Sequence, residues 1–280
     1  MKPISTGRTD IGRSRKHNED SFVCDDAIGL YVVADGVGGH AKGEIASAES
    51  VSQIQNWVMG ARDARRAYLE APEDEATRFA VRRTLESAVQ QACYMVFGMA
   101  EMNPDQRGMS TTISALLILG ERAFIAQVGD SRVYLLRGDD SVQLTEDHTL
   151  INYKLKQGLI TPEQAKQAKG KNVITRAVGH KEYVEVDNTQ VDLQPGDRLL
   201  LCSDGLHGYL QDGELGGLVG ELPSDEACQK LVDLANQRGG KDNITAVIVR
   251  IEGGHDGEAA ARAKKLETKQ RILGKMPLFT

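Results

Sequence analysis

The 280-residue chain has few aromatic residues and no excess of positive charge. Aromatic residues make up 5% of the sequence, and the formal net charge is −6 at pH 7. Proteins that bind nucleic acids rely on basic side chains to neutralise phosphates, and often on aromatic rings that stack on bases. The composition therefore argues against a nucleic-acid partner.

Cysteines and long apolar runs are also scarce. The four cysteines form no CxxC pair, so neither a disulfide framework nor a zinc site is indicated: Cys24, Cys93, Cys202 and Cys228. The polar N-terminus lacks the apolar segment of a signal peptide. No apolar run approaches the roughly 18 residues that a membrane span requires. We expect a soluble, cytoplasmic protein with no membrane partner.

The apolar residues that are present, 40% of the chain, predict one large domain. Helical spacing predicts helices over about 48–58, 81–99 and 224–238, and Ser224 is the expected N-cap of the last. Short apolar runs predict strands over residues 30–34, 113–119, 122–128, 132–137, 142–144, 184–191, 198–202 and 244–251. The four runs between 113 and 144 are predicted to form an antiparallel meander, because turn signals separate them.

Helices and strands fall in separate groups along the chain, which favours an α+β fold over a parallel α/β sheet. We expect residues 1–252 to form this one domain. The tail over 253–280 is expected to be a basic, partly helical appendage. Residues 256–280 hold six Lys and Arg but three Asp and Glu, whereas the rest of the chain is acidic.

Four short acidic motifs are the main functional signal. They are Asn18-Glu19-Asp20, Ala34-Asp35-Gly36, Ser203-Asp204-Gly205 and Lys241-Asp242-Asn243. Carboxylates from distant segments suit Mg²⁺ or Mn²⁺, which prefer hard oxygen ligands. The glycines that follow Asp35 do not form a P-loop, since the Gly-Lys-Ser/Thr order is missing.

The motifs resemble, in their order, the metal-dependent protein phosphatase family (protein phosphatase type 2C), in its bacterial single-domain form. Other matching stretches are Gly12–Arg15, Ser110–Thr112, Val128–Arg132, Leu144–His148 and Ile174–Gly179. The resemblance covers about residues 9–251. It implies two packed antiparallel β-sheets flanked by helices, an α-β-β-α sandwich, with a two-metal site between the sheets.

The resemblance also implies a role for each site residue. Asp35 would bridge two Mn²⁺ or Mg²⁺ ions, and the Gly36 carbonyl would bind one of them. Glu19 and Asp20 would complete that side, while Asp204 and Asp242 would hold the other ion. The remaining assignments are Asp130 as a ligand of a weaker third ion, Arg15 as the substrate-phosphate ligand and Asn243 as support for the metal-bound water.

The implied reaction is hydrolysis of phosphoserine and phosphothreonine in proteins by direct attack of a metal-bridging hydroxide. Animal members place a histidine after the Asp-Gly pair, but Val37 occupies that position here. His40 or metal-bound water is then the general acid, and we favour the water. The region from about His148 to Lys171 is predicted to be a flap that shapes substrate choice, whereas His148 itself is expected to be hydrogen-bonded within the core.

Three functions are compatible with these motifs. The first is a general Mn²⁺- or Mg²⁺-dependent Ser/Thr phosphatase that opposes a Ser/Thr protein kinase in signalling and acts as a monomer. The second is the same enzyme dedicated to one phosphorylated regulatory protein. The third is a non-catalytic phosphoprotein-binding module, which loss of ligand carboxylates would indicate. All predicted ligands are present, so we favour an enzyme.

Overall fold

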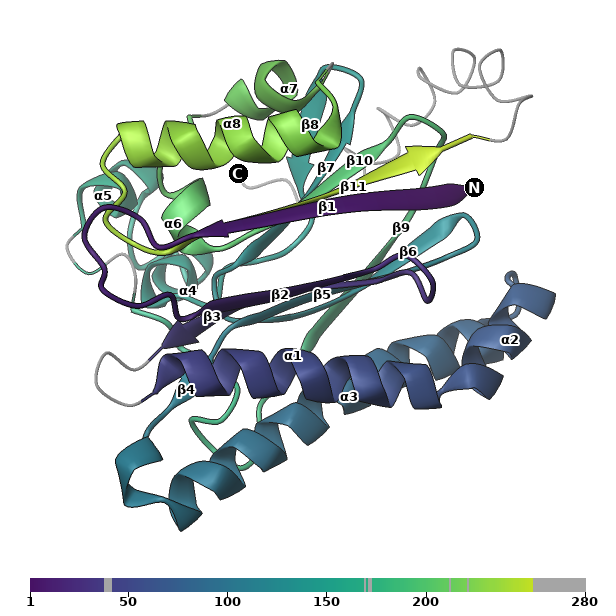
Figure 1. Ribbon diagram of the computed structural model, residues 1–280, viewed down its shortest axis with the longest axis horizontal. Coiled ribbons are helices and arrows are strands. Elements are labelled where there is room, and N and C mark those ends of the chain that lie inside the picture. Colours follow the sequence, from purple (N-terminus) through teal and green to yellow (C-terminus); the bar gives the residue numbers. More distant parts are fainter. Residues whose placement is uncertain (38–41, 169, 171–172, 212, 221, 254–280) are drawn as a thin grey trace.

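Two antiparallel β-sheets pack face to face, and helices cover the outer side of each (Figure 1). The computed structural model describes residues 1–37, 42–168, 170, 173–211, 213–220 and 222–253. The first sheet has the order β1 (Lys2–Asp10), β11 (Ile244–Glu252), β10 (Arg198–Cys202), β7 (Arg132–Arg137) and β8 (Asp140–Gln143). The second has the order β2 (Asp20–Asp25), β3 (Leu30–Val37), β5 (Ile113–Leu119), β6 (Arg122–Val128) and β9 (Asp187–Asp192), with β4 (Ser110–Thr111) paired to β3. The predicted α-β-β-α sandwich is confirmed.

The helices form two outer layers and one peripheral group. The second sheet is covered by α1 (Gly43–Gly60) and α3 (Glu75–Met102), with α2 (Arg62–Glu70) and the short 3₁₀ turn η1 (Pro104–Gln106) beside them (Figure 1). The first sheet is covered by α6 (Asp204–His207), α7 (Glu214–Val219) and α8 (Ser224–Gln237). The region expected to be a flap contains α4 (Leu150–Lys156) and α5 (Pro162–Gln167). None of the described helices is long and apolar enough to cross a membrane.

Side-chain alternation along β3 explains how the sheets place an acid between them. Tyr31 and Val33 pack in the core between the two sheets. Leu30 and Val32 pack instead against the helices on the outer face. Because successive side chains of a strand point to opposite faces, Asp35 continues the series of Tyr31 and Val33. The carboxyl group therefore lies where the inner core ends.

The predicted meander between 113 and 144 is wrong in its pairing. β5 pairs with β6 in the second sheet, while β7 pairs with β8 in the first. The chain crosses from one sheet to the other through Gly129-Asp130-Ser131, where Gly129 has a φ of 97°. Apolar alternation marks each strand but does not say which strand it pairs with.

Two other local expectations differ from the structure. Pro223, not Ser224, occupies the N-cap position of α8, and that helix end has no side-chain cap hydrogen bond. The sequence pattern predicts no strand in the polar N-terminus, whereas β1 pairs with β11 over its full length. Its half-buried, mostly polar residues lack the apolar pattern of a strand.

Candidate active site

Asp20 and Asp35 lie opposite each other on the antiparallel pair β2 and β3. Side chains at directly paired positions share a face of the sheet, with Cβ atoms roughly 5 Å apart. Strand pairing alone thus brings together two of the predicted ligands. Both belong to the second sheet and face the first.

The Ser110–Thr112 motif holds the backbone of Asp35. The N–H of Asp35 donates to the Thr112 hydroxyl at 3.0 Å. The Asp35 carbonyl oxygen accepts from the Thr112 N–H at 2.9 Å and from the Thr111 hydroxyl at 2.8 Å. The sequence marked this motif without giving it a role. Its two threonines fix the main chain from which the Asp35 carboxyl projects.

Asp20 joins the two sheets. Its Oδ2 accepts hydrogen bonds from the Ser203 hydroxyl at 2.8 Å and from the Thr245 hydroxyl at 2.6 Å. Ser203 directly precedes Asp204, and Thr245 lies three residues after Asp242. Oδ1 of Asp20 is buried and has no hydrogen-bond partner. A buried unpartnered carboxylate oxygen is costly, so this atom suits a ligand or an ordered water.

Asp204 and Asp242 come from neighbouring segments at the ends of β10 and β11. Asp204 begins the one-turn helix α6, and Gly205 packs against the backbone of Asn243 so closely that a Cβ would overlap the Asn243 carbonyl oxygen. The close approach requires glycine at this position. The Asp-Gly pair therefore serves packing as well as turn formation.

Asn243 is buried, and its side chain binds the N-terminal loop. Its Nδ2 donates to the carbonyl oxygens of Ile11 and His17 at 3.0 Å each. Its Oδ1 accepts from the Glu19 N–H at 2.8 Å. Both amide donors are thus used on backbone atoms. The contacts shown position the loop that carries Arg15 and Glu19, and the predicted role of Asn243 in supporting a bound water stays a prediction.

Glu19, Gly36 and Arg15 complete the arrangement. The Gly36 N–H donates to the Glu19 carbonyl oxygen at 3.1 Å, and a Cβ on Gly36 would lie 2.6 Å from that oxygen. The Arg15 guanidinium lies 2.8 Å from the Asp242 carboxylate and 3.6 Å from that of Glu19. Its side chain is 42% exposed, so Arg15 can meet a ligand from solvent.

The electrostatics show that the acids form one cluster. Burial raises the pKa of Asp35 well above its ordinary value, and Asp20, Asp204, Asp130 and Asp242 raise it further. Burial also raises the pKa of Asp20 and that of Asp130 to about 7. The pKa of Asp204 is raised by burial and by Asp242, although a hydrogen bond with Asp35 opposes the shift. Carboxylates that disfavour each other's charge in this way are suited to binding cations.

The residues fit a site for divalent cations with hard oxygen ligands. The observations are the mutual pKa shifts, the unpartnered Oδ1 of Asp20 and a donor set made of carboxylates. Among the described residues, no group of three or more His, Cys, Asp or Glu side chains is arranged so that it could hold a metal ion as it stands. Individual ligand roles are therefore proposals. His40, the candidate general acid, lies outside the described residues.

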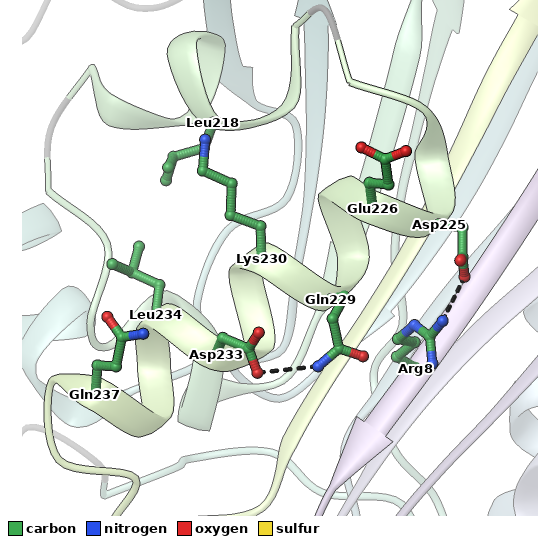
Figure 2. Close-up of a pocket in the computed structure, with 9 residues that line it drawn as sticks. All are labelled: Arg8, Leu218, Asp225, Glu226, Gln229, Lys230, Asp233, Leu234 and Gln237. Carbon is green, nitrogen blue, oxygen red and sulfur yellow. Dashed lines mark hydrogen bonds and ion pairs between the residues drawn. The ribbon is translucent and has the colours of Figure 1, made fainter.

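A separate hollow lies on the outer side of α8 (Figure 2). Arg8 of β1 forms an ion pair of 2.6 Å with Asp225 there, and Gln229 donates to Asp233 at 2.9 Å. The residues that line this hollow include none of the acids of the cluster. The cluster lies instead at the ends of the strands, on both sheets.

This combination of an α-β-β-α sandwich with acids gathered from both sheets is that of a metal-dependent phosphatase. The family model described as protein phosphatase 2C matches residues 11–248. The chain belongs to the protein phosphatase 2C family. The serine/threonine phosphatase stp of Listeria innocua is 38% identical over 246 residues, which cover 86% of this chain and 93% of that protein.

Solved structures agree with the sequence comparison. The serine/threonine phosphatase PstP/Ppp of Mycobacterium tuberculosis superposes with a TM-score of 0.78 at 33% identity, covering 90% of this chain and all of that one. A PstP catalytic domain in complex with two manganese ions superposes with a TM-score of 0.76 at 32% identity, covering 90% and 99% of the two chains.

Proposed function

We propose that the chain is a Mn²⁺- or Mg²⁺-dependent protein phosphatase that hydrolyses phosphoserine and phosphothreonine in proteins. One observation carries the proposal: five aspartates from separate segments, two of them buried and three half-buried, form a single cluster in a chain of the protein phosphatase 2C family. Support comes from relatives named as serine/threonine phosphatases and from the manganese-containing PstP structure.

The proposed ligands divide between the two sheets. Asp35 would be shared by two ions, with Glu19 and the Gly36 carbonyl on one side and Asp204 and Asp242 on the other. Asp20 would act directly or through water, which its unpartnered Oδ1 supports. Asp130 would contribute to a third, weaker ion. When bound, the ions would neutralise phosphate charge and supply hydroxide at neutral pH.

Arg15 is the proposed phosphate ligand. A guanidinium holds two phosphate oxygens in a planar fork, which an ammonium group cannot do. Arg15 already points into the acidic cluster through Asp242 and Glu19, and it remains accessible to solvent. Asn243 would keep it there, because the Asn243 amide binds the backbone of the same loop. The substrate phosphate would then lie between Arg15 and the ions.

The wider assignments follow from this activity. We propose phosphorylated proteins as substrates, opposition to a Ser/Thr protein kinase in cytoplasmic signalling, and action as a monomer. Residues 1–252 would be the catalytic domain, with the basic tail dispensable for turnover. The segment from His148 to Lys171 would be a flap that selects among substrates.

Turnover of a phosphothreonine peptide by chelator-treated protein tests the proposal. Without added metal we expect no phosphate release, and we expect release to return with Mn²⁺ or Mg²⁺. Undiminished turnover in chelator, or recovery with Zn²⁺ alone, would contradict the assignment. A panel of unrelated phosphopeptides distinguishes a general phosphatase from one dedicated to a single target. Binding without turnover at any metal concentration would indicate the non-catalytic module.

A further inference from the structure

Two histidines outside the proposed ligand set contact the peptide backbone that carries Asp130. The Gly129 N–H donates to Nδ1 of His148 at 3.1 Å, and the His148 N–H donates to the Gly129 carbonyl oxygen at 2.9 Å. The Asp130 carbonyl oxygen lies 2.9 Å from Nε2 of His207, which can donate to it. The two histidines therefore bind the N–H and the carbonyl oxygen of Gly129 and the carbonyl oxygen of Asp130.

Each histidine belongs to a different functional segment. His207 ends α6, the one-turn helix that begins with Asp204. His148 follows β8 and directly precedes Thr149, the N-cap of α4 in the proposed flap. The backbone of Asp130 is thus tied to a proposed metal ligand on one side and to the flap on the other.

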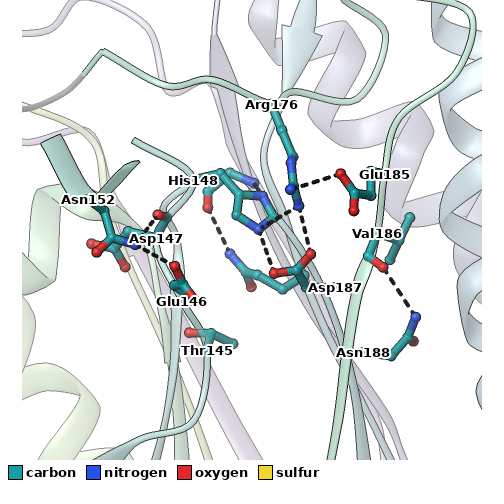
Figure 3. Close-up of polar contacts among 12 residues, drawn as sticks. Thr145, Glu146, Asp147, His148, Asn152, Arg176, Glu185, Val186, Asp187 and Asn188 are labelled. Carbon is teal, nitrogen blue, oxygen red and sulfur yellow. Dashed lines mark hydrogen bonds and ion pairs between the residues drawn. The ribbon is translucent and has the colours of Figure 1, made fainter. Parts of the chain in front are cut away.

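The hydrogen bonds of His148 define its orientation and its proton. Because Nδ1 accepts from Gly129, the neutral ring carries its proton on Nε2. Nε2 lies 3.1 Å from Asp187 of β9, and Asp187 also forms a 2.6 Å ion pair with Arg176 (Figure 3). Nη1 of Arg176 also lies 3.2 Å from Nε2, so the Gly129 N–H at Nδ1 sets the tautomer, and Asp187 supplies the acceptor for the Nε2 proton and orients the ring.

The turn is held from a third direction by Thr112. Gly129 has a φ of 97°, which favours glycine, and a Cβ there would lie 2.6 Å from the Thr112 side chain. The Thr112 hydroxyl is 2.8 Å from that of Ser131, and it also binds the Asp35 backbone. The Ser131 end of the Gly129–Ser131 turn is thereby fixed relative to Asp35, while His148 holds Gly129 at the other end and His207 holds Asp130 in the middle.

We infer that His148 and His207 are positioning residues that hold the Gly129–Asp130 backbone so that the Asp130 carboxyl stays in the cluster with Asp35 and Asp204. The inference rests on the proposed function, in which Asp130 contributes to the weakest of the metal sites. Neither histidine contacts a reacting atom in this account. His148 acts through the main chain of Gly129, and His207 acts through that of Asp130.

Paired substitutions separate this role from general packing. His207→Gln keeps a side-chain N–H close to the position of Nε2, whereas His207→Leu removes it at similar volume. His148→Asn keeps an acceptor close to the position of Nδ1, whereas His148→Leu removes it. Calorimetry of Mn²⁺ binding to the chelator-treated full chain is the readout.

Both leucine variants should weaken the weakest Mn²⁺ site by about tenfold or more, the usual effect of losing a residue that orients a metal ligand. The two tighter sites should stay within about threefold of the native protein, and the Gln and Asn variants should bind all ions within about that factor. Native binding in both leucine variants would overturn the inference. An equal loss of Mn²⁺ affinity at every site, in the leucine variants and in the Gln and Asn variants alike, would also overturn the inference. Such a result would indicate that the histidines have a merely structural role.

Asp130→Asn distinguishes failure of the inference from failure of the function. If it abolishes the weakest site while the leucine variants bind normally, the positioning role is wrong and the proposed function stands. If it leaves that site unchanged, the proposed role of Asp130 falls, and the inference falls with it.

A spectroscopic readout needs no metal and no unstable variant. In the chelator-treated native protein, the ¹⁵N shifts of the His148 ring should show Nδ1 unprotonated and Nε2 protonated. The Gly129 amide proton should move upfield in His148→Leu and much less in His148→Asn, because only the latter retains an acceptor. A protonated Nδ1 in the native protein at neutral pH would exclude the hydrogen bond from Gly129. That result would overturn the inference even if the leucine variants did not fold.

Discussion

Replacing Asp130 with asparagine should make the chelator-treated protein more stable at alkaline pH. Asp130 is 7% exposed, and burial together with the charge of Asp204 raises its pKa from 3.8 to about 7. A carboxyl whose folded pKa is raised stabilises the fold at low pH. That contribution is lost as pH rises through the folded pKa. Asparagine has a similar shape and carries no charge, so it removes this dependence.

The size of the effect follows from the shift. Above the unfolded pKa of 3.8, each unit of pH costs about 1.4 kcal/mol until the folded pKa of about 7 is reached. Between pH 5 and pH 8 the interval is about two units, so this carboxyl lowers the free energy of unfolding by about 3 kcal/mol. The free energy of unfolding of Asp130→Asn, relative to that of the native protein, should therefore be about 3 kcal/mol higher at pH 8 than at pH 5.

Urea unfolding followed by circular dichroism, in chelator at pH 5 and pH 8, measures this difference. Asp63→Asn is the matched control, because Asp63 is 97% exposed on α2 and lies outside the acidic cluster. Its stability relative to the native protein should be the same at both pH values, within about 0.5 kcal/mol. If Asp130→Asn behaved like this control, the carboxyl would not be buried among like charges, and the electrostatic account of the cluster would be refuted.

Three further substitutions test single contacts. Arg15→Lys should lower kcat/KM on a phosphothreonine peptide by about 10–100-fold, because lysine cannot bind two phosphate oxygens as the planar guanidinium does. The control Arg13→Lys should change kcat/KM little, and equal effects of the two substitutions would exclude a phosphate role for Arg15. Gly36→Ala should lower the free energy of unfolding by about 1–3 kcal/mol, since a Cβ meets the Glu19 carbonyl oxygen, and unchanged stability in urea unfolding would contradict that packing. Thr112→Val should cost about 1–3 kcal/mol in the same assay, because the Asp35 N–H loses its partner; a neutral effect would show that this bond is replaceable.

Local sequence signals predicted the elements that carry the acids better than their pairing. The apolar run before Asp35 and the one before Asp204 identified β3 and β10, because continuous buried strands have a strong signature. The sequence does not predict β1, since its half-buried, mostly polar residues lack this signature. The sequence predicts a meander turn at Gly129–Ser131, where the chain in fact crosses between the sheets, because turn residues are alike in both situations and only tertiary pairing distinguishes them.

The sequence predicts which residue types make up the candidate site, but it does not predict the hydrogen bonds that connect them. Short acidic motifs indicated the candidate ligands, whereas the residues that support them carried no chemical signal of their own. Thr112 and Ser203 act through hydroxyl groups on a backbone N–H and a carboxylate from distant segments. His207 has a function only because the 129–131 turn folds onto α6. Such contacts depend on long-range packing, which sequence spacing does not encode.

Anomalous diffraction at the manganese edge from crystals soaked in Mn²⁺ would test the central claim most directly. The account predicts two strong peaks that share the Asp35 carboxylate, one completed by Glu19 and the Gly36 carbonyl, the other by Asp204 and Asp242. Asp204→Asn should lose the second peak and turnover together. Manganese bound elsewhere with Asp35 unliganded, in crystals of a protein that still hydrolyses phosphopeptides, would contradict it.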